Sequence, residues 1–443
     1  MAKILFVQNI NCEMLGIMSI SSYVSSKHEV DVALGSNGEI IEKCRTFKPD
    51  VIGISLLSAG HQWGLDISKS LKSCCENSII LIGGPHPTFF NEIIKHEYVD
   101  AICIGEGEKP VLNLLNKIDS NEDINCIRSI WIKRNNKVLK NDIEPLLKKE
   151  EIPIPDRTLY RDITHIYDSQ NLRVMCSRGC RFKCNFCTNY SLTKLYNAPL
   201  FRNRAINDIL DEIKSAQKHK NITSVTFHDD IFGAEKKWTK GFLCQYKKEI
   251  SLPFWCLLQC TLITESLIDQ LKEAGCYWVG VGVESGDEYI RNIILGKNIP
   301  SKIIEKACSI LNMKKVKFNT YNMFHMPEEN YSESLKTLEL NIRIKPAYAY
   351  SSTFQPYPGT RHYSEDVKDK VLSADFNRFD ACVEYSKDSK KILRLRKLFS
   401  IIVRFPVIKF FLPVLVRVPM DYIYDKISKY SWHFLYYKKV YGK

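Results

Sequence analysis

Cys176-Ser177-Arg178-Gly179-Cys180-Arg181-Phe182-Lys183-Cys184-Asn185-Phe186-Cys187 is the segment on which the interpretation of this chain depends. Three of its cysteines, Cys180, Cys184 and Cys187, have the spacing C-x3-C-x2-C, and Cys176 precedes them. Thiolate sulfur is the usual ligand of iron–sulfur clusters, and three such ligands leave one iron of a [4Fe–4S] cluster open. The alternatives are a zinc knuckle or scattered core thiols. Zinc usually takes a second C-x2-C pair or a distant Cys/His pair, and no second pair follows here.

The segment resembles the signature of the radical S-adenosylmethionine (SAM) enzymes. Ser177-Arg178-Gly179 before the motif and Phe186 before its last cysteine both match. The resemblance implies that Cys180, Cys184 and Cys187 hold a [4Fe–4S] cluster whose open iron is chelated by SAM. One electron from the cluster would then cleave SAM to a 5′-deoxyadenosyl radical. The expected reducing partner is an electron donor such as a flavodoxin or ferredoxin.

Length and cysteine content limit the class of protein. A chain of 443 residues that is 45% hydrophobic is long enough for two or three domains. Sixteen cysteines in this length are too dilute for a disulfide scaffold, and Met1–Val7 runs directly into a strand pattern without a signal peptide. We therefore expect reduced thiols and a cytoplasmic protein.

The charge of the chain is concentrated near its C-terminus. The net charge is +13, and residues 390–443 contain 13 Lys and Arg against 2 Asp and Glu. The body is therefore almost neutral and the tail is basic. This asymmetry indicates a local anionic partner for the tail, and no base-reading motif suggests nucleic-acid binding.

Residues 1–145 alternate short apolar runs with helical patterns, as βα units of a doubly wound parallel sheet do. The expected strands are Ile4–Val7, Val51–Ser55, Ile79–Ile82 and Ala101–Ile104, and the expected helices are Met14–Ser25, Gly38–Phe47, Gln62–Cys75 and Asn91–Glu97. A hairpin at 129–140, turning at Asn135-Asn136, should close the domain. Such sheets bind ligands beyond the carboxyl ends of their strands. Composition alone would suit any flavodoxin-like nucleotide or flavin domain.

Three segments of this domain resemble the cobalamin-binding domain that often precedes a radical SAM domain. They are Lys48–Ser55, Gly83–Thr88 and Asp100–Glu108. The resemblance implies cobalamin contacts from the loops at the strand ends, namely Asn11, Glu13, Gly16, Ser55, Trp63, Gly83, Gly84, His86, Gly105 and Glu106.

One loop departs from the cobalamin-mutase pattern D-x-H-x-x-G, whose histidine ligates cobalt. Residues 11–16 read Asn-Cys-Glu-Met-Leu-Gly, so Glu13 stands in place of that histidine. The lower face of a bound cobalamin would then lack a histidine ligand, which should favour methyl transfer to a carbon radical. Trp63 is a candidate to cover this face, and a core aromatic is the alternative. His86 could face the ligand, which the loop match favours, or be a turn residue.

Residues 146–169, with Ile152-Pro153-Ile154-Pro155, are expected to be a linker to a second domain at 170–365. Its strand patterns are Leu172–Cys176, Ser224–His228, Phe254–Gln259, Tyr277–Glu284, Val316–Phe324 and Tyr348–Gln355. Helical patterns fall at Ile206–Lys218, Thr264–Ala274, Lys302–Asn312 and Ser332–Ile344. Repeated βα units predict a partial (β/α)6 TIM-like barrel with functional groups at the carboxyl ends of its strands.

Several strand ends of this domain also match the radical SAM family. Residues 202–204 resemble its R-x-R, 229–232 its D-D-x-F, 282–286 its G-x-E-S-G and 356–360 its P-Y-P-G-T. The resemblance implies SAM contacts from Phe186, Arg204, Asp229, Asp230, Gln259 and Glu284. Carboxylates there suit the ammonium and ribose hydroxyls of SAM.

Two of these positions differ from the family pattern. Gln259 stands where relatives often have arginine, so it can hydrogen-bond a cofactor but lacks the charge. His325 replaces the first glycine of G-x-P-G-E-T. It is the candidate catalytic residue, able to donate to a substrate or take a proton, and a structural role is the alternative.

Residues 366–443 are expected to form a basic, amphipathic, helical region. Apolar runs alternate with isolated bases, none reaches the roughly 20 residues of a spanning helix, and Pro406, Pro413 and Pro419 divide them. One alternative is peripheral contact with the inner membrane face, which would suit a lipid-linked substrate. The other is a helical cap on the barrel with a solvated basic face.

These features together predict a cobalamin-dependent radical SAM enzyme. The family resemblance implies that the 5′-deoxyadenosyl radical takes a hydrogen from an unactivated carbon of a small-molecule or lipid-linked substrate. Methylcobalamin then delivers a methyl group, and a second SAM regenerates it. The alternative with the same cofactors is cyclisation or rearrangement. A non-catalytic iron–sulfur redox protein is the alternative from another class.

Overall fold

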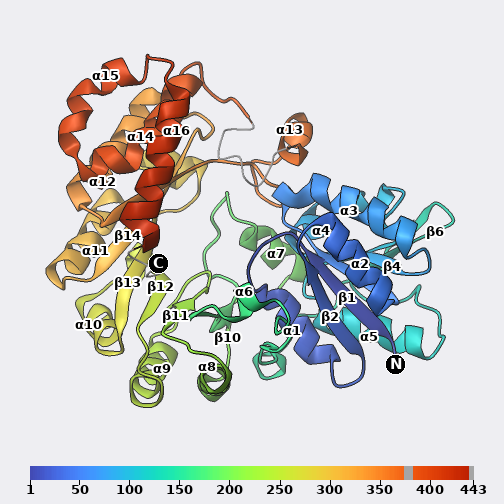
Figure 1. The fold of residues 1–443 in the computed structure, drawn as a ribbon. Coiled ribbons are helices and arrows are strands. Elements are labelled where there is room, and N and C mark those ends of the chain that lie inside the picture. Colours follow the sequence, from blue (N-terminus) through green and yellow to red (C-terminus); the bar gives the residue numbers. More distant parts are fainter. Residues whose placement is uncertain (374–382, 439–443) are drawn as a thin grey trace. The chain divides into compact units, whose positions relative to one another are not determined.

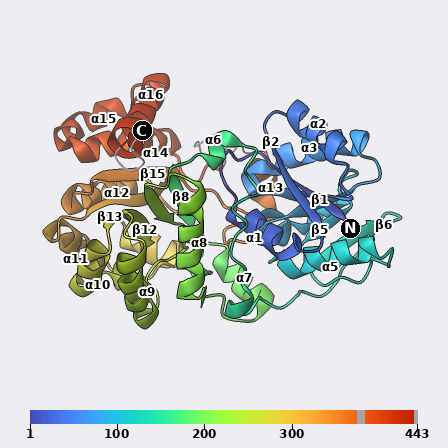
Figure 2. The same ribbon diagram turned by 60° about the horizontal axis from the view of Figure 1, so that its bottom comes forward.

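The structure is a computed structural model that describes residues 1–373 and 383–438. Its contacts divide the chain into two compact units, whose elements are labelled in Figures 1 and 2. The first unit contains Met1–Ser169, Tyr190–Asn221 and the described part of 357–376, and the second contains Gln170–Asn189, Ile222–Pro356 and the described residues from 383 onward. The units therefore interleave along the chain, whereas the sequence patterns predicted consecutive domains. The difference arises because 190–221 and the segment after 357 pack with the N-terminal sheet.

The first unit is built on a seven-stranded sheet. Its order is β2 (Glu29–Leu34), β1 (Lys3–Gln8), β3 (Val51–Ser55), β4 (Ile79–Gly83), β5 (Ala101–Cys103), β6 (Ile130–Arg134) and β7 (Lys137–Leu139). Strands β1 to β5 are parallel in the order 2-1-3-4-5, which confirms the doubly wound sheet. The predicted hairpin forms as β6 and β7, because Asn135 and Asn136 adopt φ values of 47° and 61°.

Helices pack on both faces of this sheet. Helices α1 (Leu15–Val24) and α5 (Glu108–Asp119) contribute to one buried cluster, and α2 (Asn37–Phe47) and α3 (His61–Cys74) contribute to another. The helix expected at Asn91–Glu97 is instead a short 3-10 turn, Asn91–Lys95, which follows α4 (Pro85–Phe89).

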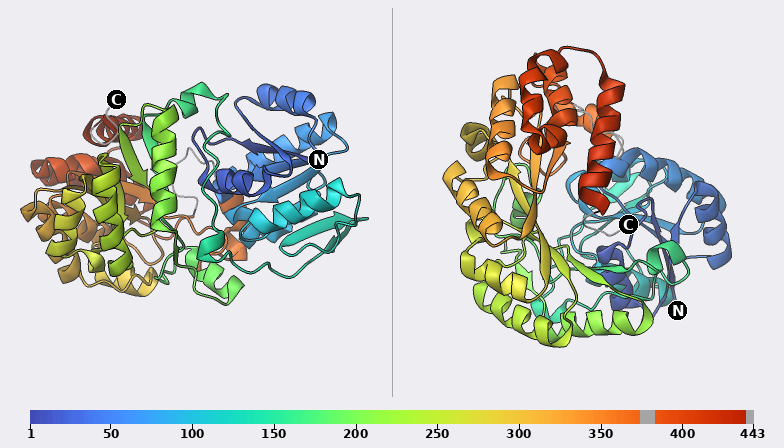
Figure 3. Two further views of the ribbon diagram at one scale, coloured as in Figure 1. Left: turned by 90° about the horizontal axis from the view of Figure 1, so that it is seen from below. Right: turned by 60° about the vertical axis from the view of Figure 1, so that its left-hand side comes forward.

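The second unit contains a six-stranded parallel sheet in sequential order. Its strands are β8 (Asn171–Val174), β11 (Ser224–Phe227), β12 (Phe254–Leu258), β13 (Cys276–Glu284), β14 (Lys317–Phe324) and β15 (Tyr348–Thr353). Helices α9 (Lys236–Glu249), α10 (Glu265–Glu273), α11 (Ser301–Met313) and α12 (Tyr331–Ile344) alternate with them. In the right-hand view of Figure 3 the yellow and orange helices line one side of these strands. The sequential parallel order confirms the partial (β/α)6 barrel.

The helix pattern predicted at Ile206–Lys218 forms α8 (Ile206–His219), but its contacts assign it to the first unit. Helix α9 was not predicted. Its few apolar positions are mostly aromatic and lie between lysines at both ends of the helix, so the apolar stripe is short in the sequence.

The C-terminal region is helical, as predicted. Helix α14 (Ser389–Arg404) packs on α12 and β15, where Leu395 and Phe399 join Phe324 and Leu338 in one buried cluster. It is followed by a 3-10 turn (Pro406–Phe411), α15 (Leu412–Leu415), α16 (Asp421–Ser431) and a π-helical turn (Trp432–Tyr437). Helix α14 is thus a cap on the barrel. Within 1–373 and 383–438, no helix combines the length and the apolar character needed to cross a bilayer.

Candidate functional site

The cysteine motif lies on the loop that follows β8 and the short strand β9 (Ser177–Arg178). All three thiols, Cys180, Cys184 and Cys187, are half-buried. Burial raises the pKa of each thiol, that of Cys184 to about 11, and Cys187 raises the pKa of Cys180 and Cys184 further. The backbone of Phe182 donates to Cys180 and that of Asn189 donates to Cys187. The loop thus carries three half-buried thiols, and N–H donors are already directed at two of them, Cys180 and Cys187, as suits the ligands of an iron–sulfur cluster.

The loop is fixed by the residue between its second and third cysteines. The backbone N–H of Asn185 donates to Leu295 O at 2.8 Å, and its side-chain Nδ2 donates to Ile294 O at 3.0 Å. Gly296, at φ 63°, allows this approach, because a Cβ there would lie 2.8 Å from the Asn185 side chain. Phe186 packs against an apolar cluster that includes Leu295 and Met326. The cluster loop is therefore anchored to the turn that follows β13.

Asp229, predicted to contact SAM, is buried beneath the start of this loop. It accepts hydrogen bonds from the backbone N–H of Cys176, at 3.1 Å, and from the hydroxyl of Ser177. Burial raises the pKa of Asp229 to about 6. Cys176 is itself buried, between β8 and β9. This carboxyl supports the chain leading into the motif, and contact with SAM stays a prediction.

Its neighbour Asp230 is exposed and accepts a hydrogen bond from Asn189 Nδ2 at 3.1 Å. Asn189 also donates to the Cys187 sulfur. Of the two predicted carboxylates at the end of β11, Asp230 is therefore the one on the accessible side, beside the motif.

Glu284 ends β13 in the left-handed region, at φ 67°. Its Oε1 lies 2.7 Å from Lys297 Nζ, and both side chains are buried. A Cβ at Gly282 would lie 2.5 Å from Glu284 Oε1 and 2.7 Å from Lys297 Nζ. The glycine before this glutamate therefore makes room for a buried ion pair. The sequence analysis missed Lys297, which carries no signal besides its charge.

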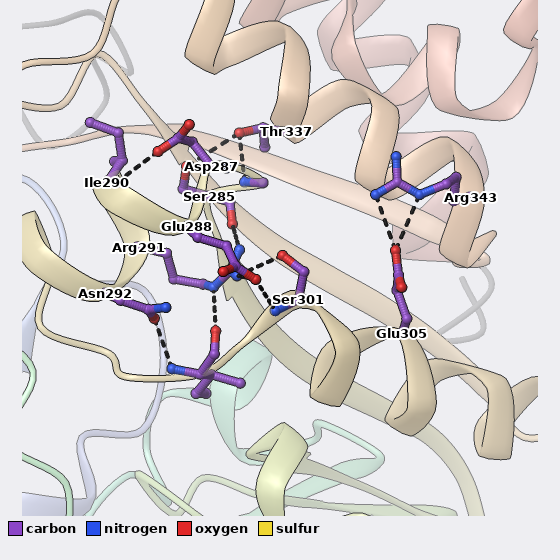
Figure 4. A network of polar contacts seen from close by, with 12 residues as sticks. Ser285, Asp287, Glu288, Ile290, Arg291, Asn292, Ser301, Glu305, Thr337 and Arg343 are labelled. Carbon is purple, nitrogen blue, oxygen red and sulfur yellow. Dashed lines mark hydrogen bonds and ion pairs between the residues drawn. The ribbon is translucent and has the colours of Figure 1, made fainter.

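The loop after Glu284 is held by a polar network that Figure 4 shows. The guanidinium of Arg291 is fully buried and donates to Ser285 O at 2.6 Å, to Ile299 O at 2.7 Å and to Ser301 Oγ at 2.8 Å. The Gly286 N–H donates to Thr337 Oγ1 at 2.8 Å. Arg291 was not predicted. Its signal in the sequence is an arginine in the segment 290–294, which also contains three isoleucines.

Gln259 is half-buried at the end of β12, and its Oε1 accepts from the Thr261 N–H at 2.8 Å. Its side-chain oxygen therefore caps the turn at Cys260–Leu262. Contact with SAM stays a prediction for this residue.

His325, the candidate catalytic residue, is fully buried at the end of β14, with φ 67°. Neither ring nitrogen has a hydrogen-bond partner that meets geometric criteria among the described residues. Burial lowers the pKa of this imidazole, although Glu384 and the Val383 backbone oppose the shift. The ring centroid lies 6.3 Å from that of Tyr385.

In the first unit, several predicted cobalamin contacts are engaged within the protein. His86 is fully buried, and its ring nitrogens bond His61 Nδ1 at 2.9 Å and Ser58 Oγ at 3.1 Å. Burial lowers the pKa of His86 to about 3. Both nitrogens are engaged within the protein, and the ring stacks on Phe90. Contact of His86 with cobalamin stays a prediction.

Glu13, which replaces the cobalt-ligating histidine of the mutases, is also buried. Its Oε2 lies 2.9 Å from Arg157 Nη1, and its Oε1 lies 3.0 Å from Lys220 Nζ. Arg157 also pairs with Glu212, which accepts from Arg204 Nη1 at 2.6 Å. Glu13 and Arg204, predicted to contact cobalamin and SAM, thus belong to one buried ion-pair network. Both contacts stay predictions.

The loop after β5 is covered by the segment 190–221. Gly105 has φ 82°, and a Cβ there would lie 1.9 Å from the Tyr196 hydroxyl oxygen. That hydroxyl accepts from the Glu106 N–H at 2.7 Å, and the Glu106 carboxylate pairs with Arg202 at 2.6 Å. Gly105 and Glu106 were predicted to meet cobalamin, and in this structure they pack against the chain itself.

The remaining predicted positions form the open part of the strand ends. Gly16 is exposed, with nothing within 4 Å of a Cβ position, and the exposed Asn11 bonds His165. Ser55, Gly83 and Gly84 are half-buried. A Cβ at Gly83 would have no neighbour nearer than 3.7 Å, whereas one at Gly84 would lie 2.9 Å from Leu56 O. The open backbone at Gly16 and Gly83 can admit a flat ligand, so this edge fits a cobalamin. Trp63 is half-buried against the core cluster beneath α3, as its alternative interpretation expected.

The chain resembles known proteins in both units. The B12 binding domain family matches residues 9–115, and the Radical SAM superfamily matches residues 174–340. The chain is 27% identical to an uncharacterized methyltransferase of Pyrococcus horikoshii, over 81% of this chain and 79% of that protein. It is 25% identical to the anaerobic magnesium-protoporphyrin IX monomethyl ester cyclase of Rubrivivax gelatinosus, over 78% of this chain and 63% of the cyclase.

Solved structures give the same assignment of the fold. The radical SAM methyltransferase TsrM of Kitasatospora setae, solved with cobalamin and a [4Fe-4S] cluster, superposes with a TM-score of 0.68 at 14% identity. The match covers 84% of this chain and 78% of TsrM. With both families matched in sequence and the thiol loop in place, the chain combines a B12 binding domain with a domain of the Radical SAM superfamily.

Proposed function

We propose that this enzyme methylates an unactivated carbon of a small molecule. The observation that supports it most directly is the anchored loop of Cys180, Cys184 and Cys187, with N–H donors directed at two of the sulfurs, in a chain that also has a B12-binding domain. When bound, the cluster and SAM supply one-electron radical chemistry, and cobalamin supplies a transferable methyl group.

The residues of the chain then have separate roles. The three cysteines hold the cluster, and Asn185 fixes their loop. Asp230 offers a carboxylate beside that loop to the charged and hydroxyl groups of SAM, and Lys297 orients Glu284 for the same purpose. Glu13 is held by Arg157 and Lys220, so we propose that no side chain from this position ligates cobalt from below.

Cyclisation is a second candidate function, because the chain is also similar to an anaerobic cyclase. The two are distinguished by products. We would reconstitute the full chain anaerobically with iron, sulfide and cobalamin, add dithionite and SAM, and measure 5′-deoxyadenosine and S-adenosylhomocysteine by mass spectrometry. Methylation predicts both products, whereas 5′-deoxyadenosine alone favours cyclisation or rearrangement.

The matched controls are Cys184→Ala and Cys244→Ala. Cys244 is exposed on α9, so its replacement should leave both products unchanged, whereas Cys184→Ala should abolish both. A cluster-loaded native chain that forms neither product would contradict the proposal that this protein is an enzyme. A flavodoxin or ferredoxin is the proposed physiological electron donor, and it should replace dithionite in the same assay.

We also propose that the C-terminal region contacts an anionic membrane surface. Large apolar side chains are exposed along this region, with exposed fractions of 84% for Phe410 and 63% for Phe411. The others are Phe405, Val407, Val414, Met420, Tyr422, Ile423, Tyr430, Trp432 and Phe434. Figure 1 shows the helices concerned, α15 and α16, in red. Exposed aromatic and aliphatic side chains in short amphipathic helices are typical of interfacial segments.

The charge of this region complements anionic lipid. From Arg394 to Lys438 the two acids are Asp421 and Asp425, which pair with Arg394 and Lys397 of α14. The side chains of Arg394 and Lys397 are buried. The exposed charges are therefore basic, and they are Arg404, Arg417, Lys426, Lys429 and Lys438. Each basic residue near an anionic bilayer contributes about 1 kcal/mol to binding.

Vesicle sedimentation tests this contact. The native chain should bind vesicles of phosphatidylcholine with 30% phosphatidylglycerol, bind pure phosphatidylcholine far less, and dissociate at high salt. Phe410→Ser with Phe411→Ser should weaken binding at least tenfold, whereas the control Met313→Ser, 57% exposed on α11, should not. Equal binding of the vesicles by both variants would contradict a membrane role. If instead the native chain is a dimer and the Phe410→Ser, Phe411→Ser variant is a monomer, the surface binds a second copy of the chain.

A further inference from the structure

Three thiols of the first unit meet at the ends of two helices. Cys44 lies near the end of α2, Cys74 is the last residue of α3, and Cys75 follows it. The Sγ atoms of Cys44 and Cys75 are 2.7 Å apart, and those of Cys74 and Cys75 are 3.6 Å apart. All three Sγ atoms lie within 4.8 Å of one another. In a doubly wound sheet, helices end at the edge opposite to the carboxyl ends of the strands, so this group is separate from the predicted cobalamin loops.

Apolar packing alone would be the simplest explanation, because a free cysteine behaves as a small hydrophobic residue. It would not by itself direct three sulfurs from two helices at one another. Cys44 is fully buried, while Cys74 and Cys75 are half-buried, so solvent reaches one side of the group. This asymmetry is typical of a ligand set that is closed by protein on one side and completed from solvent on the other.

The surroundings favour a cation between these sulfurs. Both α2 and α3 end here, and the C-terminal end of a helix carries a partial negative charge that attracts cations. Without a metal, burial raises the pKa of Cys44 and Cys74, which favours the protonated form of these two thiols. A bound metal ion displaces these protons, because a coordinating thiol is deprotonated outright.

We propose that Cys44, Cys74 and Cys75 bind one thiophilic metal ion of the Zn²⁺ type, which clamps the end of α2 to the end of α3. Zinc–sulfur bonds of about 2.3 Å at tetrahedral angles separate the sulfurs by about 3.8 Å. The closest pair therefore has to open by roughly 1 Å from the metal-free separation. Water is the fourth ligand, on the side where Cys74 and Cys75 are accessible. Binding releases the thiol protons to solvent, and no electron transfer is involved.

Zinc titration of the full chain tests this site. The protein is reconstituted anaerobically with its iron–sulfur cluster, so that Cys180, Cys184 and Cys187 are occupied, and is kept under reductant. Zn²⁺ is then added in competition with a chromophoric chelator, and bound zinc and iron are measured after desalting. The native chain should retain one zinc ion per chain beyond its iron.

Cys74→Ser with Cys75→Ser should lower the affinity for zinc at least a hundredfold. The matched control replaces the exposed cysteines Cys126 and Cys244 by serine and should bind zinc as the native chain does. Zinc should also raise the thermal unfolding midpoint of the native chain and of the control, but not that of the Cys74/Cys75 variant. The single variant Cys74→Ala keeps the test valid if the double variant does not fold.

Two outcomes would overturn the proposal. One is a native chain that retains no zinc beyond its iron, and the other is equal zinc uptake by the Cys74/Cys75 variant. Neither result depends on cobalamin or on SAM cleavage, so failure here is distinguishable from failure of the proposed methylation.

Discussion

Lys297 Nζ lies 2.7 Å from Glu284 Oε1, and the pair is buried at the end of β13. Gly282 lies against both charged groups, and no other residue type would leave them this space. A buried ion pair adds little net stability, but removal of one partner leaves an uncompensated charge. The geometry therefore explains why the glutamate is preceded by a glycine, and it makes Lys297 a positioning residue for Glu284.

Lys297→Met should destabilise the second unit by about 3–5 kcal/mol, because Glu284 is left buried without a partner. Adding Glu284→Gln should recover a large part of this loss. Thermal and urea unfolding of the two single variants and the double variant form a double-mutant cycle. Additive effects in that cycle would show that the two side chains do not interact.

Glu13→His should not convert the first unit into a histidine-ligated cobalamin domain. The substitution removes the carboxylate that pairs with Arg157 and Lys220. The positive charges of these two side chains then lie near one another without the carboxylate between them. We expect a loss of about 3–5 kcal/mol, measured as a lower unfolding midpoint without cofactor. Glu13→Gln should show a similar loss, and the exposed Glu42→Gln should show none. A Glu13→His chain as stable as the native one would refute the network.

The fold was predictable because its strands are nearly continuous apolar runs. Ile79–Gly83 and Phe254–Leu258 are buried on both faces, so periodicity and turn residues were enough to locate them. Strand β2 was missed because it is the edge strand and only half-buried, so polar residues interrupt its run. Sequence patterns also could not predict that the two units interleave along the chain. The segment 190–221 joins the first unit through contacts between distant residues, such as that of Tyr196 with Gly105.

The site was predictable where the chemistry itself constrains the residue type. Three cysteines at C-x3-C-x2-C predict a cluster loop without any structure. The hydrogen-bond and ion-pair partners of the predicted residues could not be predicted from the sequence. His61, which bonds His86, and Arg157, which bonds Glu13, lie far from these residues in sequence, and pairing at such separations is set only by the folded chain.

Glu329 should make the stability of the second unit depend on pH. It is fully buried, and burial raises its pKa from an ordinary 4.5 to about 7, although Met326 N and Ser334 Oγ donate to it. The folded state thus holds the proton more tightly than the unfolded state. The stabilisation is complete below pH 4.5 and is lost as the pH rises through 7, a change of about 3 kcal/mol.

Glu329→Gln should remove this pH dependence, because the amide stays neutral at every pH. The unfolding midpoint of the native chain should fall between pH 5 and pH 8 more steeply than that of the variant. Glu305→Gln is the matched control, because Glu305 pairs with Arg343 on the surface (Figure 4). If Glu329→Gln keeps the pH dependence of the unfolding midpoint and Glu305→Gln removes it, a group other than Glu329 titrates.

His325 and Glu328 both occupy the left-handed region, with φ values of 67° and 61°, at positions where the family pattern has glycine. A residue with a Cβ in this region costs about 1 kcal/mol or more. We therefore expect His325→Gly to be more stable than His325→Ala by about 1 kcal/mol, the reverse of the usual order of these residues. Glu328→Gly and Glu328→Ala, at an exposed position, should show the same difference without any change in core packing.

Equal stability of the glycine and alanine variants at both positions would show that the backbone is not strained. If the strain is present, the histidine is kept at a position that disfavours it, which supports a role for its ring in the reaction. Cleavage of SAM without substrate should then be unchanged in His325→Gly, because the cluster cysteines are untouched. A loss of that cleavage, with the cluster still bound, would instead place the ring against SAM.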